Sequence, residues 1–247
     1  KVYQKLYELI LPKELRNDAC FIVMGSEGRN EQIIKTDQDN ALVIKDGIEV
    51  EQYKFYMNEI TKNLIDFGYP TCEGNIMVSN PFWCKTVNEY KNETARWIEA
   101  PGIQNYMDLA IFFDSFAVAG NKELLINLKD NLFNKLHDKD VFMAYFAKAT
   151  LAFDTPNTVT NIMTKSHIID IKKTAVFPIV QGIRSLALKE KIRETTTIKR
   201  IKILENRKVL EKDKAAELLE AFDFVNTIRL KSQLFDIQHG KKITNEI

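Results

Sequence analysis

The chain has 247 residues, of which 45% are hydrophobic and 28% are charged. A chain of this length can bury one large hydrophobic core or two modest ones, and the composition excludes a fully disordered or collagen-like protein. Basic and acidic side chains number 35 and 34, which gives a formal net charge of +1. Proteins that bind nucleic acid through many phosphates usually carry a basic excess, so this balance disfavours nucleic acid as a partner.

The cysteines and the apolar runs exclude further classes of protein. Cys20, Cys72 and Cys84 are too few and too scattered for a disulfide framework, and no histidine is spaced with them as zinc ligands are. No apolar run reaches the roughly 18 residues that a membrane span needs, and no signal peptide is visible. We therefore expect a cytosolic protein with no membrane partner. Because the chain begins at Lys1, we also expect that it can be a piece of a longer protein.

The first half of the chain mixes predicted helices with predicted strands. The helical spacing of apolar residues predicts helices over residues 1–15 and 50–67. Continuous apolar runs predict buried strands over residues 19–24 and 40–45, and a third strand-like run covers residues 109–118. Strands interleaved with helices indicate an α/β or α+β module.

The second half changes character. From about Lys122 onward the sequence is typical of helix after helix, with few glycines and almost no strand pattern. Asp213 is suited to cap a helix, because apolar residues recur at helical spacing after it. We predict two domains, residues 1–125 with the N-terminal helix and residues 126–247. The predicted fold class is α+β, a sheet module followed by an all-α helical bundle.

The first candidate catalytic and binding residues lie between the first two predicted strands. Gly25 and Ser26 open a turn into a short helix, where glycine lets the backbone approach a ligand and the amides face anions such as a phosphate chain. Asp37 and Asp39 precede the second strand, and residues two apart on an extended segment point to the same face. Two neighbouring carboxylates repel each other unless a cation joins them. Mg²⁺ suits this pair, because it takes carboxylates together with substrate phosphates.

Such a pair is suited to two-metal nucleotidyl transfer. The metals neutralise the triphosphate, lower the pKa of the attacking hydroxyl, and hold the attacking and leaving oxygens in line. A third carboxylate normally completes the site, and the run from Asp108 to Asp114 offers one at each end. Their even spacing would place both on one face of a strand. Asp114 is the better candidate, because a carboxylate next to aromatic residues is costly to bury without a partner.

Each part of this pattern has an ordinary explanation when it occurs alone. A Gly-Ser pair is mostly a plain turn, and most Asp-x-Asp pairs are solvated turn residues or helix caps. The two together, after one buried strand and before another, are much more specific. We therefore favour the functional interpretation of the combined motif.

The combined motif resembles that of the DNA polymerase beta-like nucleotidyltransferases, in which an apolar strand, Gly-Ser, a spacer and Asp-x-Asp entering a second strand follow one another. The longer runs from Gly25 to Gln32 and from Thr36 to Leu42 match a more specific pattern within this group. They resemble the nucleotidyltransferase domain of bacterial signalling proteins that also carry cyclic-nucleotide-binding and CBS domains. That domain is similar to the catalytic parts of protein-PII uridylyltransferase and glutamine synthetase adenylyltransferase.

Further stretches extend the resemblance over nearly the whole chain. The helical half is similar to the substrate-binding domain that accompanies this nucleotidyltransferase domain. The matching stretches are Ser79-Asn80-Pro81 with Trp83, Trp97-Ile98, Ile111 to Asp114, Ile169 to Lys172, Arg184 with Ala187-Leu188, and Arg229-Leu230 with Gln233 and Gly240.

The resemblance implies a role for each residue of the motif. Asp37 and Asp39 would be metal ligands, and Asp114 would be the third carboxylate, so that all three would be catalytic. Gly25 and Ser26 would contact the triphosphate through their backbone, with help from the Ser26 hydroxyl.

Three further positions leave alternatives open. Arg29 would either add a phosphate contact or pair with a carboxylate such as Glu31. Lys172 would bind the nucleotide if it lines a cleft between the two halves, but a solvated pair with Asp170 on a helix is equally open. Phe116 stands where the family often has an arginine two residues after the third aspartate, which makes catalytic activity less assured.

We predict an enzyme that transfers a nucleoside monophosphate from an NTP to a hydroxyl group with the help of Mg²⁺ or Mn²⁺. The acceptor would be a protein that sits between the sheet module and the helical half, and upstream cyclic-nucleotide-binding or CBS domains would control the site in bacterial signalling. The alternative is a catalytically silent module that binds a nucleotide within a larger signalling protein. Addition of nucleotides to RNA is disfavoured by the near-neutral charge.

Overall fold

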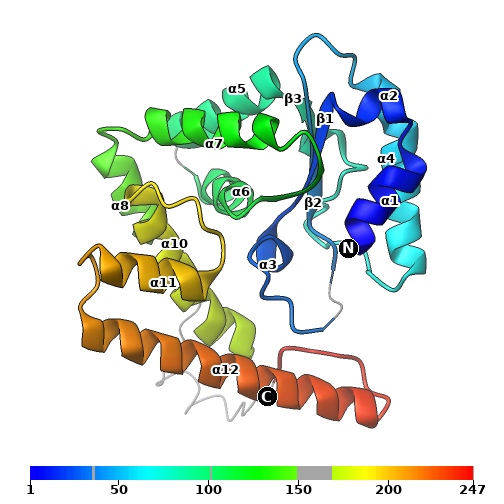
Figure 1. Cartoon of the computed structure of the whole chain (residues 1–247). Coiled ribbons are helices and arrows are strands. Elements are labelled where there is room, and N and C mark those ends of the chain that lie inside the picture. Colours follow the sequence, from blue (N-terminus) through cyan, green and yellow to red (C-terminus); the bar gives the residue numbers. More distant parts are fainter. Residues whose placement is uncertain (35–36, 101, 149–168, 247) are drawn as a thin grey trace. The chain divides into compact units, whose positions relative to one another are not determined.

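The chain consists of two compact units, Lys1–Lys139 and Asp140–Ile247. The computed structural model describes residues 1–34, 37–100, 102–148 and 169–246 (Figure 1). The boundary that the sequence suggested, between residues 125 and 126, falls inside helix α7 (Lys122–Lys135). This helix packs on the sheet of the first unit, so it belongs there rather than with the helical unit.

A four-stranded sheet forms the centre of the first unit, with the strand order β3-β2-β1-β4. Strand β1 (Ala19–Val23) is antiparallel to both β2 (Asn40–Ile44) and β4 (Phe116–Gly120), whereas β3 (Cys84–Thr86) runs parallel to β2. The strands β1 and β2 fall where the sequence predicts them. Every residue of both strands is buried.

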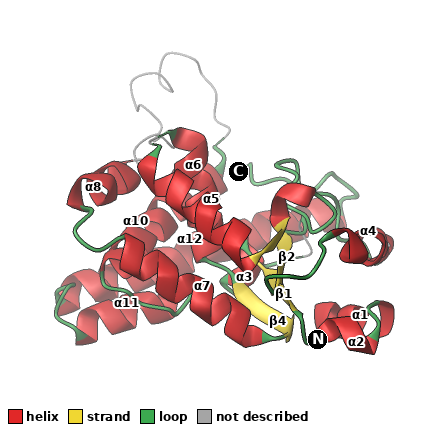
Figure 2. Ribbon diagram, turned by 90° about the horizontal axis from the view of Figure 1, so that it is seen from above, coloured by secondary structure: helices red, strands yellow, loops and turns green. Residues whose placement is uncertain are grey.

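Helices cover both faces of this sheet, as Figures 1 and 2 show from two directions. On one face, α1 (Val2–Ile10) packs beside α4 (Glu51–Asp66). On the other face lie α7, α5 (Val87–Glu99) and α6 (Ile103–Phe113). Strands buried on both faces carry apolar side chains in both directions, which explains why β1 and β2 read as continuous apolar runs instead of alternating ones.

The third predicted strand, residues 109–118, is only partly a strand. Helix α6 continues through Phe113, and β4 begins at Phe116. Leu109, Phe112 and Phe113 are fully buried, and a helix buried on several sides gives the same apolar run as a buried strand. Asp108 therefore lies on a helix, where its carboxylate accepts a 2.8 Å hydrogen bond from Gln104 Nε2. The even spacing of Asp108 and Asp114 does not place them on one strand face.

Short helical pieces and caps complete the first unit. The predicted helix over residues 1–15 is divided at Leu11 and Pro12, so that α1 is followed by the short helix α2 (Lys13–Arg16). A single 3-10 turn, η1 (Pro81–Trp83), leads into β3. The turn α3 (Gly25–Gly28) directly follows β1 and is described below with the site.

The described part of the second unit is helical, as the sequence predicts. Its helices are α8 (Asp140–Lys148), the π-helical turn η3 (Lys172–Val176), α10 (Phe177–Lys189), α11 (Thr197–Asn206) and α12 (Lys212–Gln238). The α+β fold class, a small sheet module followed by a helical domain, is confirmed. Within the described ranges, no helix is both long enough and apolar enough to cross a membrane.

A capping box starts α5, the helix that covers β2 and β3. The Thr86 hydroxyl accepts the Glu89 N–H at 3.3 Å, and the Glu89 carboxylate accepts the Thr86 N–H at 2.7 Å. We expect Thr86→Ala to lower the free energy of unfolding by about 1 kcal/mol, because a helix-start amide loses its partner. Urea titration measures this loss. Thr71→Ala, at an exposed position outside any helix or strand, is the control and should leave stability nearly unchanged.

Candidate active site

Strand pairing brings the sequence motifs to one edge of the sheet. Val23, at the end of β1, pairs with Asn40 at the start of β2 and with Phe116 at the start of β4. Because both pairings are antiparallel, the residues after β1 lie beside the residues before β2 and β4. Those flanking segments hold Gly25 and Ser26, Asp37 and Asp39, and Asp114.

Gly25 lies directly against the carboxylate of Asp39. A Cβ atom built on Gly25 would come within 2.2 Å of Asp39 Oδ2, and Gly25 has a positive φ of 55°. The Met24 N–H also donates a 2.8 Å hydrogen bond to the Asp39 carbonyl oxygen. Only glycine leaves room for the carboxylate in this position. The second glycine of the motif, Gly28, is packed as closely, since its Cβ would lie 2.3 Å from the Asp114 carbonyl oxygen.

The structure brings Asp37 and Asp39 together and adds a third side chain. One carboxylate oxygen from each aspartate and the sulfur of Cys72 all lie within 4.8 Å of one another. The Cys72 thiol is hydrogen-bonded to the Asp39 carboxylate. Burial and the charge of Asp39 raise the pKa of this thiol to about 12. The first residue of the second motif, Thr36, lies outside the described residues.

The residues that alternate with the two aspartates point the other way. Gln38 and Asn40 are fully buried, and both bind the segment over residues 69–78. The Gln38 N–H donates to the Pro70 carbonyl at 3.2 Å, and the Asn40 N–H donates to the Ile76 carbonyl at 3.0 Å. The side chains therefore alternate as the spacing predicts. The two inward-facing residues, Gln38 and Asn40, fix the loop that carries Cys72.

Asp114 and Arg29 form a buried ion pair near this edge. Asp114 is fully buried and Arg29 is 5% exposed, and their side chains meet at 2.8 Å between Nη1 and Oδ2. Arg29 Nε also binds Glu31 Oε2 at 2.7 Å. Burial alone would lower the pKa of the guanidinium, but the charges of Asp114 and Glu31 outweigh it and raise the pKa above its ordinary value. Of the two alternatives for Arg29, the structure contains the pair with carboxylates.

Lys129, from α7, fixes the turn that carries Asp114. Its ammonium group is buried and donates to the carbonyl oxygens of Phe113 at 3.1 Å and Ser115 at 2.6 Å. The carbonyls on either side of Asp114 are thus held by one cation. The backbone of Asp114 is fixed as firmly as its side chain.

Glu27 is held between helix α1 and the aspartates. The Tyr3 hydroxyl donates a short hydrogen bond to the Glu27 carboxylate. Burial raises the pKa of Glu27 to about 7, with a smaller contribution in the same direction from the charge of Asp39. A second ionisable carboxyl group therefore lies close enough to Asp39 to sense its charge.

The remaining predicted site residues have other surroundings. The carbonyl of Ser26 accepts the Glu31 N–H at 2.8 Å, which closes the turn after β1. Lys172 belongs to the second unit, where its ammonium group lies 5.4 Å from the centre of the Phe177 ring. Asp170 pairs with Lys173 at 3.6 Å. A nucleotide contact by Lys172 stays a prediction.

The donor set at this edge fits a divalent cation. Two carboxylates with converging oxygens are the hard ligands that Mg²⁺ and Mn²⁺ take, and they commonly leave room for substrate phosphates. Gly25 provides an independent sign of the fit, because the turn after β1 comes so close to Asp39 that a side chain there would collide with its carboxylate. Backbone and carboxylates together make a place for a cation bound to a phosphate chain.

Two family models match the chain. Residues 1–104 match the family described as "Putative nucleotidyltransferase DUF294", and residues 140–247 match the family described as "Putative nucleotidyltransferase substrate binding domain". The chain is therefore similar to a nucleotidyltransferase domain in its first part and to the accompanying substrate-binding domain in its last part. No curated protein matches it. Residues 105–139, which include Asp114 and Lys129, lie outside both matches.

Sequence reasoning missed several residues of this candidate site. Gln38 and Asn40 hold the loop that carries Cys72, but their sequence positions give only a weak signal. The positions of Gln38 and Asn40 between and after the aspartates could have indicated an inward-facing row. Cys72 and Lys129 carried no such signal, because their contacts depend on how distant segments pack.

The ion pair of Arg29 gives a stability prediction. We expect Arg29→Met to lower the free energy of unfolding by about 3–5 kcal/mol, because it leaves the buried Asp114 without its partner charge. Arg29→Met combined with Asp114→Leu should recover much of that loss, since the fully buried charge of Asp114 is removed together with its partner. Urea titration of the two single variants and the double variant measures the coupling. Additive losses would contradict the pairing.

Glu27 gives a pH prediction. A folded-state pKa of about 7, against an ordinary 4.5, means that the folded protein keeps a proton that the unfolded chain releases. Stability from this group is thus lost as pH rises from 4.5 towards 7. Glu27→Gln keeps the acceptor for Tyr3 and removes the charge, so its Tm relative to the wild type should increase over this window. A flat difference, like that expected for the exposed Glu99→Gln control, would contradict the assignment.

Proposed function

We propose that the chain transfers a nucleoside monophosphate from an NTP to a hydroxyl group at the edge of the sheet where Asp37 and Asp39 lie. The acceptor oxygen bonds to the α-phosphorus, the bond from that phosphorus to the bridging oxygen breaks, and pyrophosphate leaves. The hydroxyl proton passes to solvent. The convergence of the Asp37 and Asp39 carboxylates beside Gly25 carries the proposal.

In this proposal, Asp37 and Asp39 hold the divalent cation, Mg²⁺ or Mn²⁺. When bound, such a cation supplies charge neutralisation for the triphosphate and lowers the pKa of the attacking hydroxyl. Gly25 and Ser26 supply the backbone that lies against the phosphate chain, since this turn already reaches the Asp39 carboxylate. The spacing of these groups and the match of residues 1–104 to a nucleotidyltransferase family model support these roles.

For Asp114, the structure supports a positioning role, while the metal contact that the resemblance implies stays a prediction. Its carboxylate is bound to Arg29 at 2.8 Å and is fully buried. Through Oδ2 this carboxylate is tied to Arg29, which also pairs with Glu31, so the ion pairs join the start of β4 to the turn after β1. We infer that Asp114 and Arg29 are positioning residues, which hold the turn of residues 25–31 against the start of β4.

The acceptor is inferred from the second unit and from charge. The family description of residues 140–247 names a substrate-binding domain, and we propose that this domain binds a protein that carries the acceptor hydroxyl. A net charge of +1 gives RNA little electrostatic attraction. Control by upstream cyclic-nucleotide-binding or CBS domains in bacterial signalling is part of the same proposal, and it rests on the resemblance of the motif.

A second candidate function is a module that binds a nucleotide without turning it over. Two observations favour it. Phe116 is 54% exposed at the position where the resembling family often has an arginine, so a cation that could bind phosphate is replaced by an apolar ring. Asp114 is also committed to Arg29. These features affect turnover more than binding, because the two aspartates beside Gly25 are retained.

Thermal shift with each of the four NTPs tests the proposal. With Mg²⁺ or Mn²⁺, one NTP at a hundred times its dissociation constant should stabilise the folded protein by about 2.7 kcal/mol, and EDTA should abolish the shift. Asp37→Asn combined with Asp39→Asn should remove the metal-dependent shift while the melting transition stays cooperative. Asp46→Asn, in the exposed turn after β2, is the matched control and should behave like the wild type.

Label transfer then separates the two candidate functions. An enzyme that is given a labelled NTP and a protein acceptor forms a labelled product and pyrophosphate, whereas a binding module shows the thermal shift alone. Unchanged NTP binding by the double aspartate variant would reject the site.

A further inference from the structure

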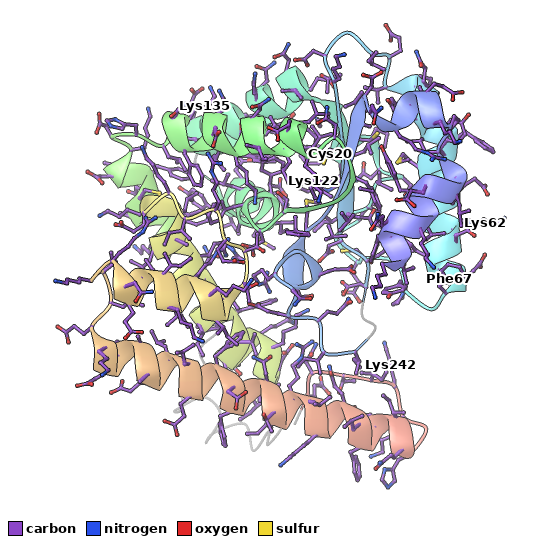
Figure 3. All side chains as sticks on the ribbon, in the orientation of Figure 1. Cys20, Lys62, Phe67, Lys122, Lys135 and Lys242 are labelled. Carbon is purple, nitrogen blue, oxygen red and sulfur yellow. The ribbon has the colours of Figure 1, made fainter. Side chains whose placement is uncertain are left out.

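Cys72 differs from the other two cysteines in what it touches. Cys20 lies on β1 between helix-covered faces, near the start of α7 where Lys122 is (Figure 3), and it pairs in register with Val43 and Gly120, away from the edge where the aspartates lie. Cys84 is buried at the start of β3. Only Cys72, among the cysteines, belongs to a described group of metal-type ligand atoms.

The sulfur of Cys72 is held in place by backbone amides. Cys72 is 8% exposed and starts a tight turn in which the Asn75 N–H donates to its carbonyl at 2.9 Å. Amides of Gly74 and Ile76 hydrogen-bond to the sulfur, and the thiol is bonded to Asp39. Two amides directed at the sulfur give it a polar environment that a packing cysteine does not need.

The loop of Cys72 is also fixed to the aspartate segment. Gln38 and Asn40 bind the backbone of Pro70 and Ile76, which lie on either side of Cys72. The Asn40 side chain adds a 2.8 Å hydrogen bond from the Val78 N–H. These buried hydrogen bonds therefore fix the distance between the Cys72 sulfur and the aspartate oxygens.

We propose that Cys72 is a third protein donor of the Asp37–Asp39 metal site and makes the site select borderline and soft divalent cations, of the Zn²⁺ and Cd²⁺ class, over Mg²⁺. This inference rests on the metal site of the proposed function. Ligand atoms within 4.8 Å of one another can share a single ion. The thiol proton that now lies between sulfur and Asp39 is released to solvent when the ion takes its place.

The chemical reason is the difference between sulfur and oxygen donors. Mg²⁺ demands oxygen ligands and keeps several waters, so it gains little from a sulfur. Thiolate favours zinc and other soft ions strongly. A site with two carboxylates alone would rank these cations mainly by size and charge. A site with Cys72 has a selectivity that this one side chain controls.

Cadmium titration into the full chain, in a phosphine reductant that carries no thiol, tests the assignment. Cd²⁺ bound to thiolate absorbs in the ultraviolet, so the absorbance reports a sulfur–metal bond independently of activity. Wild-type protein should show this absorbance with one equivalent of Cd²⁺, and excess Zn²⁺ should compete it away. Cys72→Ser should lose the absorbance and bind Cd²⁺ about tenfold or more weakly, while Mg²⁺ affinity changes by less than about threefold.

Two controls locate the sulfur and the carboxylates. Cys84→Ser, at another buried cysteine, should keep the full absorbance and affinity. Asp37→Asn with Asp39→Asn should lose both, because Cys72 alone is too poor a site. Absorbance that persists in Cys72→Ser, or in the double aspartate variant, would overturn the proposal. If Cys72→Ser fails to fold, wild-type absorbance that excess Zn²⁺ cannot displace overturns it equally well.

The outcomes also separate this inference from the proposed function. Loss of Cd²⁺ absorbance in both test variants, without any NTP-dependent thermal shift, would support the donor role of Cys72 and reject the nucleotidyl transfer. NTP binding with Mg²⁺ that is indifferent to Cys72→Ser, in a protein that never shows the cadmium absorbance, would support the transfer and reject the donor role.

Discussion

The site depends on the close approach of the Gly25 backbone to the Asp39 carboxylate. A side chain at residue 25 would come within 2.2 Å of Asp39 Oδ2, so this contact exists only because the residue is a glycine. The approach follows from the antiparallel pairing of Val23 with Asn40, which turns the chain after β1 towards the chain before β2. Burial of β1 and β2 under helices on both faces keeps this pairing in one register. The packing of the sheet core therefore also fixes the position of Gly25 against Asp39.

Charge balance explains how so many carboxylates share one edge. Asp114 and Glu31 both pair with Arg29, and Glu27 keeps its proton up to about neutral pH because it is buried. Asp37 and Asp39 are then the carboxylates to which a cation adds most. Like charges at short range otherwise raise each other's cost of ionisation. Because Asp114 is paired with Arg29 and Glu27 keeps its proton, Asp37 and Asp39 are favoured as the cation ligands.

Sequence alone predicts those features that depend on local pattern. The strands β1 and β2, the helix α4 and the α+β class follow from apolar periodicity, and the facing of Asp37 and Asp39 follows from the two-residue repeat of an extended chain. Helix α6 was misread because a helix buried on several sides has no polar stripe. The pairing of Arg29 with Asp114 spans 85 residues, and no local pattern records such a contact or the position of Cys72 beside the aspartates. Arg29 could be left only as an alternative between phosphate and carboxylate.

Two loops far apart in sequence act as one because Gln38 and Asn40 join them. Their amides bind the residue 69–78 segment from within the aspartate motif, so the spacing that turns Asp37 and Asp39 outward also turns the two clamping residues inward. A change in this segment must shift the aspartates and the sulfur together. Gln38 and Asn40 are therefore more than spacers between the aspartates, because their hydrogen bonds fix the position of the neighbouring loop. The same hydrogen bonds hold the segment that carries Cys72 beside the two aspartates, although helix α4 separates them in the sequence.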